Sequence, residues 1–234
     1  MNSETSPVYG FLKRPSMVDY PGKLAAVCFT SGCNFRCGFC HNAALLGEVK
    51  PGFDWEKLRK TCQNFRRQWV DGVVITGGEP TLAPNIMELV RFFKEQGFAV
   101  KLDTNGSKPE IVKTLLPYVD SIAMDVKCAP ETYPLLTKFR KTDRVAESIS
   151  IIRTKARDYE FRTTVIDDIH HLDEMRQIGE LIKGARRYVL QPFIPRDDLL
   201  DEELRRKKRT APDHLKKCAH LMQPYAADVV VKGV

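Results

Sequence analysis

Three cysteine thiols lie within eight residues of one another in the chain. Cys33, Cys37 and Cys40 follow the spacing Cx3Cx2C, directly after an apolar run over 24–29 that is typical of a strand. Thiolates select zinc, copper(I) or iron-sulfur clusters. Closed zinc sites and ordinary ferredoxin clusters take four protein ligands. Three thiols in one loop therefore predict a metal centre that keeps one position open.

A structural zinc site with a distant fourth ligand is the alternative that this spacing leaves open. His41, Cys28 or Cys128 could supply that ligand. The seven cysteines are odd in number and four of them are scattered, which is not the pattern of a disulfide framework. We therefore expect reduced thiols and a cytoplasmic protein.

Composition and charge narrow the class of protein. The 234 residues are 43% hydrophobic, which is ample for a core, and carry a formal charge of +7. No apolar run approaches the length of a membrane span, and residues 1–7 lack a signal-peptide pattern, so we expect no membrane partner. The positive charge is diffuse except over 205–209. That run follows an acidic segment, which favours a solvated helix over nucleic-acid binding.

Strand-like and helix-like patterns alternate along the chain. Strands are expected over 24–29, 72–75, 98–102, 119–124, 159–166 and 188–190, and apolar residues at three- and four-residue steps predict helices over 55–69, 86–93, 109–116, 145–152 and 175–182. Asp54 is expected to cap the first helix and Gly97 to close the second. Cys62 falls on the apolar stripe of the first helix, so we expect it in the core.

Six strand-then-helix units in series specify a parallel sheet with right-handed crossovers. A complete eight-unit barrel needs about 250 residues. The sequence therefore predicts an α/β fold, an open partial (β/α)6 barrel, in one domain over 1–234. Its core would span about 18–193, and 194–234 would form a C-terminal extension with a helix over 215–222 and a short strand over 228–232.

Unusual polar residues follow the predicted strands. They are Gly77, Gly78 and Glu79 after the second strand, Asp103, Thr104 and Asn105 after the third, Asp125 and Lys127 after the fourth, Arg162 on the fifth and Gln191 after the sixth. Singly, these could be turn residues or an ion pair at the rim. Because the carboxyl ends of parallel strands form one face of a barrel, we expect them to meet beside the cysteine loop.

These motifs resemble a known family. The cysteine motif with His41-Asn42, and Thr76-Gly77-Gly78-Glu79-Pro80 after the second strand, are similar to the radical S-adenosylmethionine superfamily. The segments 18–22, 102–106 and 124–127 resemble the glycyl-radical-enzyme activating enzymes, above all the activating proteins of anaerobic ribonucleoside-triphosphate reductase. The resemblance runs from about Val8 to Phe193. It implies an oxidoreductase that cleaves S-adenosylmethionine to a 5′-deoxyadenosyl radical and abstracts a hydrogen from a glycine of that reductase, with a flavodoxin- or ferredoxin-type electron donor.

The resemblance also implies roles for single residues. Cys33, Cys37 and Cys40 would bind three irons of a 4Fe-4S cluster and leave the fourth iron to S-adenosylmethionine. The residues implied in cofactor binding are Asn42, Gly77, Gly78, Glu79, Asp103, Asn105, Asp125, Lys127, Arg162 and Gln191. Asp103, Thr104, Asp125 and the Ala123 carbonyl would bind a monovalent cation. Asp19 and Lys127 are the implied catalytic residues, with Asp19 reaching toward the partner's glycine-bearing loop.

Two departures and two alternatives accompany this interpretation. Residue 191 is Gln where some related activating enzymes have His, and the chain lacks a second set of paired cysteines. A radical S-adenosylmethionine enzyme could instead act on a small molecule such as a deazapurine precursor. A zinc-stabilised binding module, with acidic partners for its basic C-terminal segment, is the alternative of another class.

Overall fold

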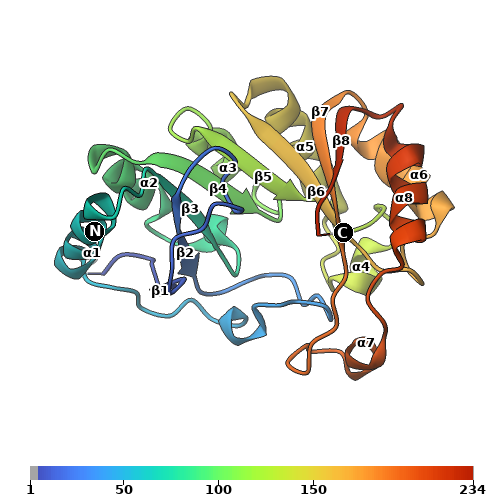
Figure 1. Cartoon of the computed structure of the whole chain (residues 1–234), viewed down its shortest axis with the longest axis horizontal. Coiled ribbons are helices and arrows are strands. Elements are labelled where there is room, and N and C mark those ends of the chain that lie inside the picture. The colour runs from blue at the N-terminus through green and yellow to red at the C-terminus, as the bar shows by residue number, and fades with distance from the viewer. Residues whose placement is uncertain (1–4, 234) are drawn as a thin grey trace.

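An eight-stranded sheet organises the chain in a computed structural model that describes residues 5–233 (Figure 1). Residues 1–4 and 234 of the predicted domain lie outside the described residues. The prediction that residues 1–7 carry no signal peptide therefore falls partly outside them. The strands follow one another across the sheet in sequence order: β1 (Gly10–Phe11), β2 (Ala25–Thr30), β3 (Gly72–Gly77), β4 (Ala99–Thr104), β5 (Ser121–Asp125), β6 (Tyr159–Val165), β7 (Ala185–Pro192) and β8 (Ala226–Val231).

The predicted parallel sheet is confirmed. Strands β2 to β8 are parallel, and β1 pairs antiparallel with β2 at one edge. The six predicted strands are β2 to β7. The seventh parallel strand, β8, comes from the C-terminal segment, whose position the sequence did not fix, and pairs with β7 from Ala185 opposite Ala226 to Leu190 opposite Val231. Because β8 does not return to β1 in this sheet order, the barrel stays open.

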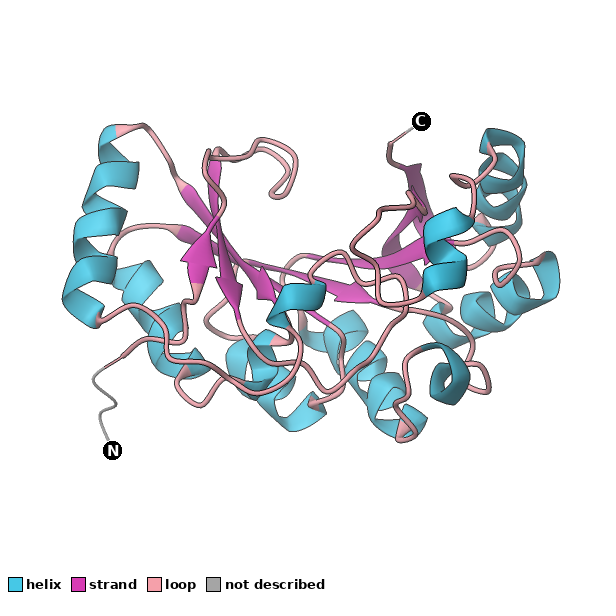
Figure 2. Cartoon of the chain, turned by 90° about the horizontal axis from the view of Figure 1, so that it is seen from below, coloured by secondary structure: helices cyan, strands magenta, loops and turns pink. Residues whose placement is uncertain are grey.

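Most of the helices lie on the convex face of the curved sheet (Figure 2). The helices of residues 5–233 are α1 (Trp55–Arg67), α2 (Ile86–Glu95), α3 (Pro109–Leu115), α4 (Tyr133–Leu136), α5 (Thr142–Lys155), α6 (Leu172–Ile182), α7 (Glu202–Arg206) and α8 (Pro212–Met222), with 3-10 turns η1 (Ala43–Leu45) and η2 (Pro80–Leu82). Within residues 5–233, none of these helices has the length and apolar character that crossing a membrane requires.

Several local predictions are confirmed. The Asp54 side chain accepts a hydrogen bond from the Lys57 amide at 2.7 Å and so caps α1. Gly97 follows α2 with φ of +80°, a conformation that glycine adopts without strain. Cys62 is buried in the core. The basic run over 205–209 is helical only at Arg205 and Arg206, where α7 ends.

The two faces of the sheet differ in character. Successive side chains of a strand point to opposite faces of the sheet. On the concave face, β2 and β3 carry a small apolar cluster that includes Val27 and Val74. On β4 the same face carries Lys101 and Asp103, since Val74 lies opposite Lys101 in register. The concave face therefore changes from apolar to charged across the sheet, and the charged part lies beside the carboxyl ends of β4 to β6.

Candidate active site

A cavity of about 380 Å³ lies at the carboxyl ends of the strands. Its size is within the range of small-molecule sites. Every site residue predicted from the sequence lines it except Ala123, which is buried on β5 beside Asp103 in register: Asp19, Cys33, Cys37, Cys40, Asn42, Gly77, Gly78, Glu79, Asp103, Thr104, Asn105, Asp125, Lys127, Arg162 and Gln191. The parallel sheet thus brings together segments that are up to 172 residues apart in the chain (191 minus 19).

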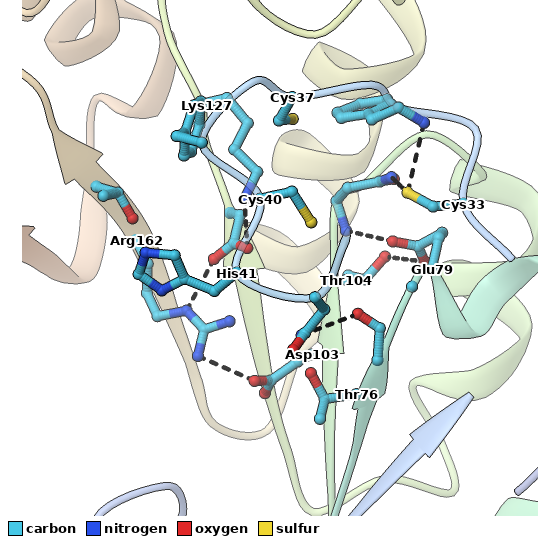
Figure 3. A pocket seen from close by; sticks show the side chains of 18 of the residues that line it. Cys33, Cys37, Cys40, His41, Thr76, Glu79, Asp103, Thr104, Lys127 and Arg162 are labelled. Carbon is cyan, nitrogen blue, oxygen red and sulfur yellow. Dashed lines mark hydrogen bonds and ion pairs between the residues drawn. The ribbon is translucent and has the colours of Figure 1, made fainter. Parts of the chain in front are cut away.

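The three predicted thiols face one end of this cavity. Figure 3 shows the sulfur atoms of Cys33, Cys37 and Cys40 in its upper part, with Asp103 below them. Within residues 5–233, no three His, Cys, Asp or Glu side chains meet closely enough to hold a single metal ion. The three thiols nevertheless line one cavity. Thiolates are the ligands that iron-sulfur clusters take, so this donor set fits such a cluster.

Burial disfavours the thiolate form of two of the three cysteines in the absence of metal. Burial raises the pKa of the Cys33 thiol to about 11 and that of Cys37 to about 12, although Lys127 opposes the rise at Cys37. Both groups are therefore protonated near neutral pH until a metal displaces the proton. Of the three candidate fourth zinc ligands, Cys28 and Cys128 are fully buried and do not line the cavity, whereas His41 lines it. All seven cysteines are free thiols, as expected.

Gly77 and Gly78, at the end of β3, let this strand end pack directly on the start of the cysteine loop, which we define as residues 31–42. A Cβ on Gly77 would lie 2.2 Å from the Thr30 carbonyl oxygen, and one on Gly78 would lie 2.0 Å from the Gly32 carbonyl oxygen. The Gly78 amide donates to Thr30 O at 2.9 Å. Asn42 Nδ2 donates to Gly77 O at 3.2 Å from the far end of the loop. These glycines therefore set the position of the cysteine loop relative to β3.

Glu79 is a buried carboxylate whose oxygens accept from several protein donors. Oε1 accepts hydrogen bonds from the Thr81 amide, the Thr81 hydroxyl and the Thr104 hydroxyl, and Oε2 accepts one from the Asn105 amide at 2.6 Å. Burial raises the Glu79 pKa, and these hydrogen bonds oppose the rise. The arrangement links the end of β3 to the end of β4. Contact between Glu79 and an ammonium group, which the resemblance implied, stays a prediction.

Asn105 connects the end of β4 to the cysteine loop. Its Nδ2 donates to Asn34 Oδ1 at 3.1 Å and lies 3.9 Å from the Cys33 sulfur. Asn34 Nδ2 in turn donates to the Ser107 hydroxyl at 2.9 Å. The sequence did not identify Asn34 or Ser107, because no pattern distinguishes these two polar residues from ordinary loop residues. Together they hold the first ligand of the cysteine motif against β4.

Charged side chains on β4 to β6, and Lys127 just after β5, form a continuous network at the cavity. Arg162 Nε donates to Asp125 Oδ1 at 2.9 Å, and Arg162 Nη1 donates to Asp103 Oδ2 at 3.0 Å. Lys127 Nζ donates to the second Asp125 oxygen at 2.7 Å, and the buried Lys101 Nζ to the second Asp103 oxygen at 2.6 Å. Arg162 and Lys127 hold the pKa of Asp125 well below its usual range despite the opposing effect of burial.

The proposed cation site overlaps with this network. Each of its two carboxylates, Asp103 and Asp125, already pairs with two basic side chains in the described chain. The Thr104 hydroxyl donates to Glu79. A cation at this place therefore stays a prediction, and it would share both carboxylates with Arg162.

Three contacts position Lys127 in the loop that follows β5. The Tyr133 hydroxyl accepts a hydrogen bond from the Lys127 amide at 3.0 Å, and the Lys127 carbonyl lies 2.8 Å from Nε2 of the buried His170. The Lys127 ammonium lies 5.7 Å from the centre of the Phe39 ring in the cysteine loop.

Sequence reasoning missed His170, since a histidine between two elements shows no periodicity. It also missed Lys101, although its place two residues before Asp103 on one strand was a signal.

The remaining predicted residues lie at the margin of the cavity. Asp19 is exposed and lines the cavity, and its carboxylate accepts a hydrogen bond from the Ser16 hydroxyl, so it also has the turn role that its sequence context suggested. Gln191 lines the cavity from β7, beside Thr164 in register. Thr76 and Thr164 add hydroxyl groups to the lining, although neither of them was assigned a role in the site from the sequence.

Comparison with known proteins gives matches over most of the chain. The sequence profile described as "Radical SAM superfamily" matches residues 27–183. The chain is 31% identical over 227 residues to a protein of Methanocaldococcus jannaschii that bears the provisional name glycyl-radical enzyme activating enzyme, and the match covers 94% of this chain and 93% of the relative. A second protein of that organism with the same provisional name is 30% identical over 188 residues, which are 79% of this chain and 72% of the relative.

A solved structure shares the fold. Streptococcus suis SuiB bound to S-adenosylmethionine superposes on 86% of this chain with a TM-score of 0.64 and 16% sequence identity. This chain spans 48% of the SuiB chain, about half of its length. At this identity the likeness concerns the fold alone, and it agrees with the open, mostly parallel sheet.

Proposed function

The chain belongs to the radical SAM superfamily, and from this premise we propose that it activates a glycyl-radical enzyme. Membership makes it a radical SAM enzyme with a 4Fe-4S cluster and S-adenosylmethionine as its cofactors. The observation that carries the proposal is the identity of 31% over 94% of the chain with a relative named for glycyl-radical enzyme activation. The finer part, that the partner is the anaerobic ribonucleoside-triphosphate reductase, rests on the segments 18–22, 102–106 and 124–127.

The residues of the cavity divide into those that would hold the cluster and those that would hold S-adenosylmethionine. When bound, these cofactors supply a 5′-deoxyadenosyl radical by one-electron reductive cleavage of the sulfonium carbon-sulfur bond. Cys33, Cys37 and Cys40 would hold the cluster, each as a thiolate. Arg162 and Lys127 carry N–H donors that suit a carboxylate or ribose oxygen. The residues that would complete this cofactor site are Asn42, Gly77, Gly78, Glu79, Asp103, Asn105, Asp125 and Gln191.

Asp19 and Lys127 are the proposed residues nearest to the reaction. Asp19 is exposed and lines the cavity, so it lies where the cavity meets solvent and can contact a loop of another protein. Tyr133 and His170 hold the backbone of Lys127, and its ammonium is positioned by Asp125. A monovalent cation between Asp103, Thr104, Asp125 and the Ala123 carbonyl remains part of the proposal. A flavodoxin- or ferredoxin-type protein would donate the electron, and free cysteines throughout the chain support a cytoplasmic location.

The proposal is tested by anaerobic reconstitution with iron and sulfide. We expect about four irons per chain, a visible absorbance band, and cleavage of S-adenosylmethionine on reduction with dithionite. Cys33→Ala, Cys37→Ala and Cys40→Ala should each lose the cluster, whereas the matched variant Cys62→Ala removes a core thiol and should keep it. A single tightly held zinc without cleavage would contradict the proposal.

Electron paramagnetic resonance then tests the partner. After the reconstituted protein is mixed with S-adenosylmethionine, reductant and an anaerobic ribonucleoside-triphosphate reductase, a glycyl-radical doublet should appear on the reductase. Cleavage without this signal would leave the radical SAM chemistry in place and exclude that reductase as the partner. Tests with formate-lyase-type enzymes and deazapurine precursors would then follow.

A further inference from the structure

The outer side of the cysteine loop is covered by the segment over 133–141. The Arg36 amide donates to the Thr137 carbonyl at 2.7 Å. The Phe35 ring lies 4.8 Å from the Phe139 ring and 6.1 Å from the Tyr133 ring, measured between centroids. Figure 1 shows the loop after β2 running under the sheet toward α4. Residues of this segment are therefore the surface neighbours of the loop whose thiols would hold the cluster.

This surface carries four exposed basic side chains. Arg36 Nη1 donates to the carbonyl oxygens of Cys33 and Phe35 at 2.5 and 2.8 Å, so its guanidinium group lies on the backbone of the cysteine loop. Lys138, Arg140 and Lys141 are exposed, and no ion pair within residues 5–233 involves any of them. The segment 133–141, which carries these three residues, contains no acidic side chain.

An apolar side chain lies beside these charges. Leu135, in α4, is 74% exposed. Basic side chains beside an exposed apolar residue suit a transient interface, in which charges steer encounter and an apolar contact holds the complex briefly. We define this surface, made of Arg36, Leu135, Lys138, Arg140 and Lys141, as the basic patch.

We infer that the basic patch docks the electron donor, a small protein with an acidic face and a one-electron redox group. This inference rests on the proposed function, because each reductive cleavage needs one electron from outside the chain. In the docked complex one electron passes from the reduced donor to the oxidised cluster, the donor is oxidised by one electron, and no atoms are exchanged. Charge complementarity identifies the class of donor, and contact with the cysteine loop identifies the place.

The other flank of the cysteine loop is less suited to an acidic donor. There the Asp201 amide donates to the Gly38 carbonyl at 3.1 Å, so the start of α7 packs on the loop. The basic run over 205–209 lies in this part of the chain, but five acidic residues precede it over 197–203. Opposite charges in one region reduce the field that steers an acidic protein. The basic patch has the larger uncompensated charge beside the loop.

The test compares charge reversal at the patch with the same reversal elsewhere. In the patch variant Lys138→Glu, Arg140→Glu and Lys141→Glu are combined. The matched control combines Arg67→Glu, Lys113→Glu and Lys217→Glu, which are exposed residues of α1, α3 and α8 outside any ion pair of residues 5–233. Both variants change the net charge equally. Each reconstituted protein is mixed anaerobically with reduced flavodoxin, and separately with reduced ferredoxin, and loss of the visible cluster band is followed by stopped flow.

We expect the patch variant to be reduced at least about tenfold more slowly than wild type by one or both donors at low salt, and to lose the salt dependence of that rate. The control variant should stay within about threefold of wild type. Dithionite should reduce all three proteins at one rate. Equal losses in both variants, a wild-type rate that salt does not change, or no reduction by either donor would overturn the docking inference. If dithionite fails to drive S-adenosylmethionine cleavage in wild type, the proposed function itself fails.

Discussion

The Glu79 carboxylate accepts a hydrogen bond from the Asn105 backbone amide at 2.6 Å, which joins the loops that follow β3 and β4. Asn105 also donates from its side chain to Asn34 in the cysteine loop. One buried carboxylate therefore takes part in positioning three chain segments that are far apart in sequence. This makes Glu79 a structural centre of the cavity, whatever ligand it also contacts.

We predict that Glu79→Gln destabilises the protein by about 1–3 kcal/mol. The amide nitrogen of glutamine would face the Asn105 N–H or the threonine donors, and a buried donor without an acceptor costs its desolvation. Urea unfolding followed by circular dichroism measures the change. Glu88→Gln, at an exposed position of α2, is the matched control and should stay within about 0.5 kcal/mol of wild type. Equal stability of the two variants would contradict the structural role of Glu79.

We predict that Arg162→Gln weakens S-adenosylmethionine binding at least about tenfold. Arg162 bridges Asp103 and Asp125, so its loss removes a charged donor from the cavity and frees both carboxylates to move. A hydrogen bond to a charged group contributes about 1.5–3 kcal/mol, which corresponds to roughly 10- to 100-fold in affinity. Titration calorimetry on the reconstituted proteins gives the dissociation constants.

Arg187→Gln is the control for Arg162. Arg187 also pairs with an aspartate, Asp228, at 2.9 Å, but both side chains are more than 40% exposed. Exposed pairs contribute little, because water screens them and the long side chains lose freedom. We expect this variant to bind S-adenosylmethionine within twofold of wild type. If Arg162→Gln also stays within twofold, Arg162 does not serve the cofactor site.

Much of the fold could be predicted because its signals are local. Unbroken apolar runs such as 72–75 indicate strands buried on both faces, and strand-helix alternation leaves a parallel sheet as the simple solution. The cysteine spacing and the polar strand ends then placed nearly every predicted residue at one cavity. The pairing of β8 with β7 was not predicted, since a short C-terminal strand carries no mark of the neighbour it will join.

The contacts inside the site were harder to predict because their partners are distant in sequence. Glu79 reads as part of a turn until the fold brings Thr104 and Asn105 to its oxygens. Lys101 lies within an apolar strand, and only its two-residue offset from Asp103 places both on the concave face. His170 depends on the Lys127 carbonyl, 43 residues away. The sequence therefore indicates which residues gather but not which of them support the others.

We predict that His170 makes stability depend on pH below neutrality. Burial lowers its pKa, because a charged ring would lose its hydration in the core; the nearby His214 also lowers it, and Glu174 opposes this. Nδ1 accepts from the Ile166 amide at 2.9 Å, so the neutral ring donates from Nε2 to Lys127 O. Below the unfolded-state pKa of about 6.5, the unfolded chain binds a proton that the folded chain does not. The contribution of neutral His170 to the free energy of unfolding is therefore complete above pH 6.5 and is lost as the pH falls below that value.

Urea unfolding between about pH 7.5 and 5.5 tests this dependence. One proton gives a slope of up to about 1.4 kcal/mol per pH unit. His170→Gln should lose this part of the slope and be less stable throughout. Burial also lowers the pKa of His41, and the part of the slope that His41 contributes should be the same in wild type and in His170→Gln. His220→Gln, at an exposed position of α8, should keep the wild-type slope. An unchanged slope in His170→Gln would assign the pH dependence to other groups.

We predict that Gly78→Ala disrupts the cysteine loop. The added Cβ would lie 2.0 Å from the Gly32 carbonyl oxygen and 2.7 Å from its carbon, so backbone has to move, and the moving segment leads directly into Cys33. Overpacking of this kind costs about 1–3 kcal/mol, and we expect the reconstituted variant to retain less than half of the wild-type iron. Gly10→Ala is the control, because a Cβ there meets nothing within 4 Å. Iron analysis after desalting compares the two. Full iron retention in Gly78→Ala would show that the loop adjusts without cost, and the close contact would then have no role in holding the cysteines.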